Sequence, residues 1–460
     1  MRKLSKLSLL PVLAPFAAAA QIAPITNTPV PLSKALVFPN YDNILVGKDQ
    51  AIEGGAYIAR AGDSSANFYN PAGLVQSEGA SLNASSAGYV YTKLTSKLSG
   101  ASISSSKLDN VPGYIGSVSK MPFVDARNLR VGLSITRAAS WSPGGVDQTF
   151  DASALGFGRL NYFSAASFQT QVYQAAAGFS PVWDRSLRLG LGVGLAETSY
   201  SNNNTVSGTQ SSSGQPAQFL ETIRASGSDY ALLFTFGAQW DVIAGLTVGA
   251  IFQPPGIELW NTSLVTSESS AVGATGGTAQ YYRDDAGTFR YKLPLTVGVG
   301  AAYRFRLFEV EADLRYHHAI SQYEFYRGSV PYQTLTTSAD SNVTVTTSPP
   351  PLVRYAAKRV FNGAIGGKVR IGAHSTVHLG FNTALSPVAD PVTSPLREAN
   401  LYAFSGGVDF QLTHFGASVG AAYQFGTSPG QSAATGNVTI LQSEILLRSF
   451  SVFYAISYDF

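Results

Sequence analysis

The sequence predicts an all-β fold, a transmembrane antiparallel β-barrel of about 14 strands. Charged residues make up only 13% of the 460 residues, whereas soluble proteins carry about 25%. Apolar side chains alternate with small or polar ones along many segments, so that one face of each predicted strand is continuously apolar. Short and long connections alternate between those segments, which is typical of bacterial barrels with short periplasmic turns and long external loops.

The first residues are typical of a secretory signal. Arg2 and Lys3 supply positive charge, Leu7 to Phe16 is a short apolar run, and Ala18-Ala19-Ala20 is a small-residue cleavage site. We therefore expect residues 1–20 to be a cleaved signal peptide. An exported chain with no apolar segment long enough for a spanning helix, and with alternating strands, is expected in the bacterial cell outer membrane.

The mature chain divides into two parts. Residues 21–78 form an N-terminal segment that is first rich in proline and asparagine and then rich in glycine and alanine, without a period of two. Residues 79–460 carry the alternation and are predicted to form the barrel. Only a closed barrel lets strands cross lipid with every backbone group paired.

The last predicted strand shows the alternation most clearly, since Phe450, Val452, Tyr454, Ile456, Tyr458 and Phe460 share one face. In the segment 308–326, one face is apolar and the other carries Glu309, Glu311, Asp313, Arg315 and His317. The segments predicted as strands are 80–92, 112–120, 129–140, 169–181, 187–201, 225–240, 245–262, 288–305, 308–326, 358–371, 376–386, 401–413, 415–427 and 448–460. The long connections, including 141–168, 202–224, 263–287 and 327–357, are predicted as external loops, which places both chain ends in the periplasm.

Two short stretches before the first strand resemble a known family. Gly54 to Asp63 is rich in Gly, Ala and Arg, and it is followed by Phe68-Tyr69-Asn70-Pro71-Ala72-Gly73. This order resembles the hatch of the FadL/TodX family, outer-membrane transporters of long-chain fatty acids and other hydrophobic compounds. The resemblance implies that residues 21–78 include a plug, or hatch, inside the barrel lumen. An alternative is that Asn70-Pro71-Ala72-Gly73 is only a type I turn that enters the first strand.

The resemblance also implies a function. It is passive transport of hydrophobic molecules, above all long-chain fatty acids, by loop capture, lumenal binding and lateral release. The alternative is a general diffusion porin for polar solutes, which the charges on strand 308–326 favour. A third class is a structural or adhesive barrel that acts through its loops.

Several residues are candidates for ligand binding. The predicted loop 141–168 is unusually apolar for a loop that faces water, which favours a first-contact groove for an apolar ligand, although a lid over the barrel would have the same composition. Arg315 and Lys368 face inward, where either could bind a fatty carboxylate or form an ion pair with Glu309, Glu311 or Asp313. The aromatic and aliphatic candidates are Trp141, Phe150, Leu155, Phe157 and Phe163.

No catalytic or metal site and no cofactor is predicted. The chain has no cysteine and no G-x-S-x-G motif. His374 and His378 would share a helix face, but in a strand residues four apart lie about 13 Å apart. The expected partners are hydrophobic small molecules, outer-membrane lipid and lipopolysaccharide, with no nucleic acid, because Lys and Arg form no run. The protein is expected to be a monomer and not an enzyme.

Overall fold

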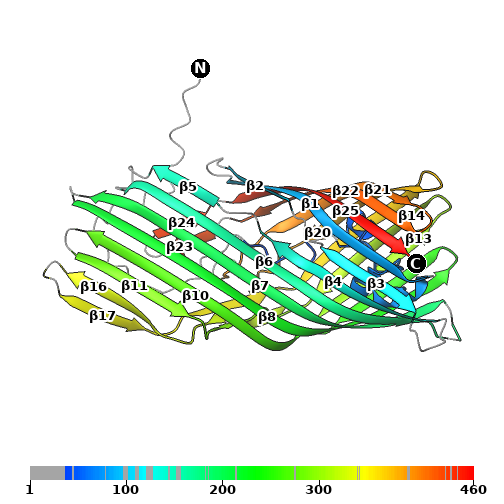
Figure 1. Cartoon of the computed structure of the whole chain (residues 1–460), viewed down its shortest axis with the longest axis horizontal. Helices are drawn as coiled ribbons and strands as arrows, with labels where there is room; N and C mark the ends of the chain where they lie inside the picture. The colour runs from blue at the N-terminus through cyan, green and yellow to red at the C-terminus, as the bar shows by residue number, and fades with distance from the viewer. Residues whose placement is uncertain are drawn as a thin grey trace, which may run out of the picture.

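The computed structural model describes most of the chain after residue 36 (Figure 1). The predicted signal peptide (1–20) and residues 21–36 lie outside the described residues, as does Leu155. The described residues are 37–43, 46–77, 79–96, 102–108, 113–120, 128–142, 146–151, 157–181, 183–184, 186–212, 215–273, 276–338, 340, 342–390, 394–429, 431–435, 438–442 and 444–460.

A closed ring of fourteen antiparallel strands forms the barrel wall in the described part of the chain, which confirms the predicted fold class. Each wall strand pairs with the next along the chain, and β25 pairs with β1 over fifteen residue pairs, which closes the ring. The wall strands are β1 (Ser81–Ser96), β3 (Tyr114–Lys120), β4 (Leu129–Trp141), β6 (Phe157–Phe179), β7 (Leu187–Ser212), β8 (Gln215–Ile243), β9 (Leu246–Gln253), β13 (Thr296–Arg304), β14 (Phe308–His317), β19 (Val360–Arg370), β20 (Ser375–Ala384), β21 (Asn400–Gln411), β22 (Phe415–Ser428) and β25 (Ile445–Asp459).

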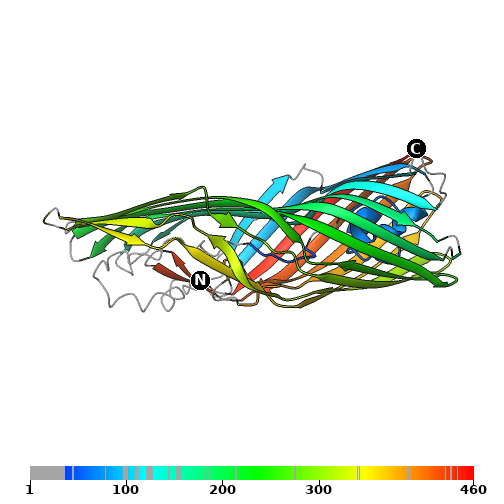
Figure 2. The ribbon, with the colours of Figure 1, turned by 90° about the horizontal axis from the view of Figure 1, so that it is seen from below.

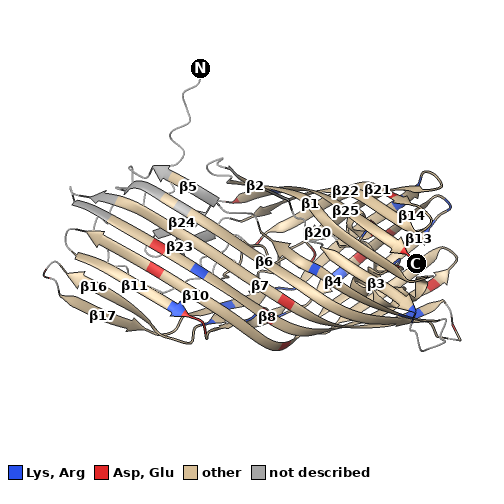
Figure 3. Cartoon of the chain, viewed as in Figure 1, with Lys and Arg blue, Asp and Glu red and all other residues tan. Residues whose placement is uncertain are grey.

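The two faces of the wall follow the alternation in the sequence. Large apolar side chains such as Leu133, Phe404 and Ile456 are exposed on the outside, where a bilayer would cover them. Their neighbours on the same strands, such as Ser134 and Ser405, are buried on the inside. Lys, Arg, Asp and Glu are correspondingly sparse along the strands (Figure 3).

Short turns join the strands at one end of the barrel, as predicted. The turn between β8 and β9 contains only Ala244 and Gly245, and Gly245 has a positive φ of 87°. The C-terminus lies at this end (Figure 1). The Phe460 N–H donates to the carbonyl oxygen of Ala80, 2.9 Å away, so the last residue and the start of β1 meet there.

At the other end the wall continues as a long sheet on one side only (Figures 1 and 2). The predicted loop 202–224 is instead a continuation of β7 and β8, which stay paired to Ser212 and Gln215. Loop predictions were wrong here because Ser, Thr and Asn at alternate positions also suit a strand whose outer face meets water. The other strands of this extension are β5 (Val146–Asp151), β10 (Ile257–Gly273), β11 (Gly276–Asp284), β16 (Tyr332–Ser338) and β17 (Val343–Ser348), while β2 (Ser102–Leu108) is paired with β1 outside it.

A second, smaller sheet supplies aromatic side chains to a buried cluster. It comprises β12 (Thr288–Phe289), β15 (Ile320–Arg327) and β18 (Leu352–Ala357). Phe289 packs on Tyr200 of β7, with ring centroids 5.8 Å apart. A separate hairpin joins β23 (Gln431–Thr435) and β24 (Val438–Gln442).

The segment before β1 lies within the ring of strands (Figure 2). It contains three short helical turns, α1 (Asp49–Ile52), α2 (Ala66–Tyr69) and the 3-10 helix η3 (Pro71–Gln76). Most of its side chains are buried, and it contacts wall strands from β4 through β22. In the part of the chain that the structure describes, no helix is long and apolar enough to cross a membrane.

Candidate functional site

The element Asn70-Pro71-Ala72-Gly73 joins α2 to η3 and is not the last turn before β1. The Asn70 side chain accepts from the Ala72 N–H and donates to the carbonyl oxygens of Ile58, at 2.8 Å, and Ala238 of β8, at 3.0 Å. Asn70 caps η3 and Pro71 begins it, because proline suits a first helical position that has no acceptor for its N–H. A Cβ on Gly73 would lie 1.9 Å from the Ala61 carbonyl oxygen, so only glycine fits there.

Phe68 and Tyr69 complete this element, which belongs to the segment predicted as the hatch; residues 46–77 are called the hatch segment, or hatch, below. The Tyr69 hydroxyl donates to the Val46 carbonyl oxygen at 2.9 Å, and the Phe68 and Tyr69 rings meet edge to face. Tyr69 is buried, and the Arg315 guanidinium lies 5.6 Å from its ring centre. Tyr69 thus binds the start of the hatch segment at Val46, while Asn70 binds the wall at Ala238.

A row of inward glycines makes room for the hatch backbone. Gly178, Gly190 and Gly237 are paired neighbours on β6, β7 and β8. A Cβ on Gly190 would lie 2.2 Å from the Ala72 nitrogen, and one on Gly237 would lie 2.1 Å from Asn70 Oδ1. Further glycines bring the wall equally close to the hatch: Gly132, Gly249, Gly366 and Gly380.

The charged face of β14 binds the hatch. The N–H groups of Tyr57 and Ile58 donate to Asp313 Oδ2 at 2.8 and 3.1 Å, and the Ala59 N–H donates to Glu311 at 2.6 Å. Arg60 Nε donates to Glu311 at 2.8 Å, and its guanidinium also contacts Glu53. These carboxylates satisfy backbone donors of an irregular segment inside the barrel, where each would otherwise be costly to bury.

A second group of contacts holds Asp42, upstream of the hatch. His317 Nε2 lies 2.8 Å from Asp42 Oδ2, the Asn362 amide donates to the same oxygen at 2.6 Å, and Arg315 Nη1 lies 3.6 Å from Oδ1. Burial alone would raise the pKa of Asp42. The His317 and Arg315 side chains outweigh that effect and hold the pKa well below its usual range.

The two predicted cations therefore both have partners in the structure. Arg315 donates to the Gly55 carbonyl oxygen at 3.0 Å in addition to facing Asp42. Lys368 Nζ lies 3.6 Å from Glu309 Oε2. Binding of a fatty carboxylate by either residue stays a prediction, and it would have to compete with these contacts.

The wall is interrupted between β2 and β3. β2 and β3 both pair with β1, but in registers that differ by two residues, since Leu108 pairs with Tyr89 and Tyr114 with Ser85. The Gly113 N–H donates to the Ser85 carbonyl oxygen, and the Arg137 N–H of β4 donates to that of Gly113. Among the described residues β2 pairs with β1 alone. The pairing of β4 with β3 ends at Thr136, so beyond Arg137 the described residues show no ladder that links β4 to β1 or β2.

Two bulges lie at the same level. The β1–β25 register shifts between Ala87 and Tyr89, and the β4–β6 register shifts between Arg137 and Ala139. Bulges bend a strand and disrupt pairing locally. Three irregularities in adjacent strands thus coincide at one place in the wall, here called the wall break.

A cavity of about 170 Å³ adjoins the wall break on the inside. Ser85, Gly113 and Arg137 line it beside the break. Its other walls are the hatch segment, with Gly47 and Ala51, and strands β20, β21, β22 and β25. The remaining lining residues are mixed in character. Those with apolar side chains are Ala87, Val90, Trp141, Ala403, Ala422 and Phe453, and those with polar side chains are Asn43, Ser86, Thr92, Ser140, Ser142, Asn382, Gln424, Ser449 and Ser451.

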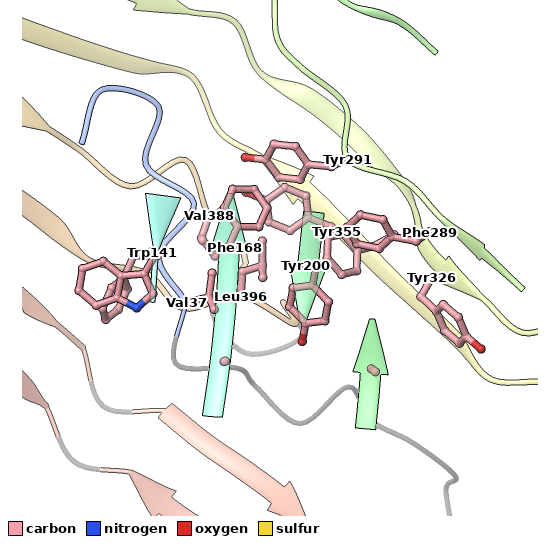
Figure 4. Close-up of a cluster of buried hydrophobic side chains, with 14 of the residues drawn as sticks. Val37, Trp141, Phe168, Tyr200, Phe289, Tyr291, Tyr326, Tyr355, Val388 and Leu396 are labelled. Carbon is pink, nitrogen blue, oxygen red and sulfur yellow. The ribbon is translucent and has the colours of Figure 1, made fainter. Parts of the chain in front are cut away.

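Trp141 links this cavity to the buried aromatic cluster. It is 7% exposed, and its ring meets that of Phe38 edge to face at 4.6 Å. Figure 4 shows Val37 and Leu396 between Trp141 and the tyrosines beyond them. The cluster's larger members are Phe38, Trp141, Phe168, Tyr200, Phe289, Tyr291, Tyr323, Phe325, Tyr326, Tyr332 and Tyr355.

The other predicted apolar residues are more scattered. Phe163 is half-buried on β6, pairing with Thr205 across the sheet and not lying in a loop. Phe150 and Phe157 lie on β5 and β6, but their side chains, like the whole of Leu155, lie outside the described residues. A shared groove of these residues with Trp141 therefore stays a prediction.

Most of the aromatic cluster was missed from the sequence. Tyr200, Tyr291 and Tyr355 fall near or within segments predicted as loops or strand ends, and Phe38 falls in the proline-rich extension. The available signal was the frequent tyrosine in segments expected to face water. Large aromatic groups are unusual in such segments, which was also the reason for selecting Trp141.

Comparison with known proteins shows which solved structures share this architecture. No protein-family profile and no curated protein matches the sequence. Among solved structures, a Pseudomonas aeruginosa FadL homologue superposes over 93% of this chain and 100% of its own, with 13% identity and a TM-score of 0.55. This chain has a FadL/TodX-type fold.

Two further structures support the same assignment. The Ralstonia pickettii toluene transporter TbuX matches 91% of this chain and 99% of its own, with 14% identity and a TM-score of 0.53. The Pseudomonas putida toluene transporter TodX matches 93% and 98%, with 12% identity and a TM-score of 0.51. The FadL/TodX resemblance of the sequence is thereby confirmed at the level of the fold.

Proposed function

We propose that this protein carries hydrophobic molecules passively across the bacterial outer membrane, with long-chain fatty acids as the first cargo to test. The cavity beside the wall break is the observation that carries the proposal. The hatch segment lies within the ring, and the cavity beside it is lined by Ser85, Gly113 and Arg137 at the wall break. A solute held there has a shorter path sideways into lipid than downward past the hatch.

Lateral release suits an apolar solute. Each buried methylene gains about 0.8 kcal/mol on leaving water, so a route from pocket to bilayer never returns the solute to water. The buried aromatic cluster, which includes Trp141, would be the capture site. Two of the similar structures are toluene transporters, which supports a hydrophobic cargo and a role other than catalysis.

Monoaromatic hydrocarbons are a second candidate cargo, favoured by the size of the cavity. About 150 Å³ suffices for benzene in an apolar protein cavity, and this cavity measures about 170 Å³. A long acyl chain would need more room, for example by displacement of Phe38 from Trp141. A fatty carboxylate, unlike toluene, would find the Arg137 side chain in the cavity lining.

The ring closes within one chain through β1 and β25, which supports action as a monomer. The N-terminal segment up to residue 78 would act as the hatch domain. The signal peptide at 1–20 and contact with lipopolysaccharide remain parts of the same proposal.

Closing the wall break tests lateral release. Deleting Asn110 and Val111 removes the two-residue difference in register, so that β2 and β3 could pair with β1 as one continuous strand. Pro112→Thr in the same variant restores a backbone donor. We expect uptake of labelled oleate and of toluene in whole cells to fall to the level of cells that lack the protein.

The matched control is Pro112→Thr alone, which keeps the two-residue difference in register. Folding of each variant is checked by gel electrophoresis, in which a folded barrel migrates differently before and after heating. Undiminished uptake by a folded, closed variant would refute release through this break, and loss of oleate uptake alone would select fatty acids over hydrocarbons.

A further inference from the structure

We infer that the seam between the hatch and the wall contains a divalent metal site formed by Asp49, His378 and Asp409. Asp49 begins α1 of the hatch, and His378 and Asp409 project inward from the paired strands β20 and β21. One ligand atom from each residue lies within 4.8 Å of the others. An imidazole with two carboxylates suits Zn²⁺ and similar first-row ions.

The hydrogen bonding of His378 is the independent observation that points to a cation. His378 Nδ1 lies 2.7 Å from Glu53 Oε1, and both side chains are fully buried. Because a carboxylate only accepts, Nδ1 must carry the proton. In the neutral ring Nε2 is then a lone pair, and it is buried without a hydrogen-bond partner.

Asp49 and Asp409 each place a carboxylate oxygen within 4.8 Å of a ring nitrogen of His378. Asp49 Oδ1 is also buried without a hydrogen-bond partner. Acceptors gathered this closely repel one another, and a cation that reaches all three residues would offset the repulsion more fully than Lys48, which contacts only the two carboxylates. Glu53 holds His378 as carboxylates hold metal-bound histidines, by taking the proton of the other ring nitrogen and fixing its orientation.

Lys48 supplies part of the positive charge at present. Its Nζ lies 2.7 Å from Asp409 Oδ1 and 3.9 Å from Asp49 Oδ1, and it donates to Gln411 at 3.0 Å. It does not reach the His378 lone pair by any contact in the described residues. A metal ion and Lys48 would thus compete for the same carboxylates, and the site must contract slightly, since ligand atoms about 2 Å from zinc lie about 3.3 Å apart.

A metal ion at this place would join α1 to two wall strands. The hatch would then be held by a coordination bond on the β20–β21 side, opposite the glycine row of β6, β7 and β8. Removal of the ion should loosen the hatch without changing the wall.

The test uses the full-length protein in detergent, treated with EDTA and then titrated with ZnCl₂ by calorimetry. We expect one Zn²⁺ per chain. His378→Gln should weaken binding about a hundredfold or more, and Asp409→Asn should also weaken it. Lys48→Gln should bind more tightly than the wild type, because the competing ammonium is gone.

His374→Ala is the matched control, since His374 is exposed in the turn that precedes the same strand. Absence of stoichiometric binding, or equal binding by wild type and His378→Gln, would overturn the site; the latter would show an adventitious ion only. If His378→Gln does not fold, the test rests on Lys48→Gln. A Zn²⁺ affinity of Lys48→Gln no higher than that of the wild type would then overturn the proposal.

Discussion

Single side chains determine where the hatch segment is attached. Asp42 is held by His317, Arg315 and Asn362, while Asp313 and Glu311 accept the backbone donors of Tyr57 to Ala59. Each contact joins residues more than 250 positions apart. The hatch therefore depends on a few buried charges whose loss leaves a partner uncompensated.

Asp42→Asn should destabilise the protein by about 1–3 kcal/mol near neutral pH, because Arg315 loses one of its two acidic neighbours and the contacts with His317 and Asn362 lose a charged acceptor. The folded-state pKa of Asp42 lies below its ordinary value of 3.8. Its contribution is therefore fully present above pH 3.8 and is lost as the pH falls through the lower folded-state value. Thermal unfolding of both proteins from pH 3 to pH 8 measures this, and a difference that grows on acidification would contradict it.

Whole elements meet through the glycine row. The hatch backbone touches β6, β7 and β8 only because Gly178, Gly190 and Gly237 lie side by side in the ladder. In the sequence these glycines look like the small residues that alternate with any lipid-facing side chain. These glycines accommodate the hatch only because its backbone at Asn70 to Ala72 packs against them. The sequence pattern of the strands does not show which segment packs there.

Gly190→Leu should displace η3, because the new Cβ would meet the Ala72 backbone. We expect a loss of stability of about 1–3 kcal/mol, as for other overpacked interiors, measured by thermal unfolding in detergent. Gly372→Leu is the control, since a Cβ there would meet nothing within 4 Å. Equal midpoints for the two variants would show that the hatch does not rest on this row.

At the scale of the molecule, a closed ring surrounds a filled lumen and carries an aromatic cap on one side. A general diffusion porin needs an open aqueous path, whereas in this barrel the segment before β1 lies within the ring of strands (Figure 2). The charges of β14, which in sequence favoured a porin, bind the hatch instead.

Single-channel recording in planar bilayers separates the two functions. The wild type should pass almost no steady current, and Glu311→Gln combined with Asp313→Asn should pass intermittent current, because the hatch loses the acceptors for four backbone N–H groups and Arg60. A large steady current through the wild type would favour the porin.

The sequence by itself determined the membrane barrel, its strand number and its short-turn end. These follow from a period of two and from turn spacing, which are local properties of the chain. The Phe68 to Gly73 stretch likewise pointed to the FadL/TodX-type fold, whereas its role as a hatch stays a prediction. The extension of β7 and β8 was missed because a polar strand outside lipid looks like a loop.

Only the tertiary structure decided the position of the wall break, the aromatic cluster and the metal-ligand group. The break depends on a two-residue difference between the registers in which β2 and β3 pair with β1, which a single strand's pattern cannot show. Asp49, His378 and Asp409 are hundreds of residues apart and meet because ring closure brings β20 and β21 to the hatch. Such sites depend on register and on what fills the lumen, and both are fixed only when the whole ring closes.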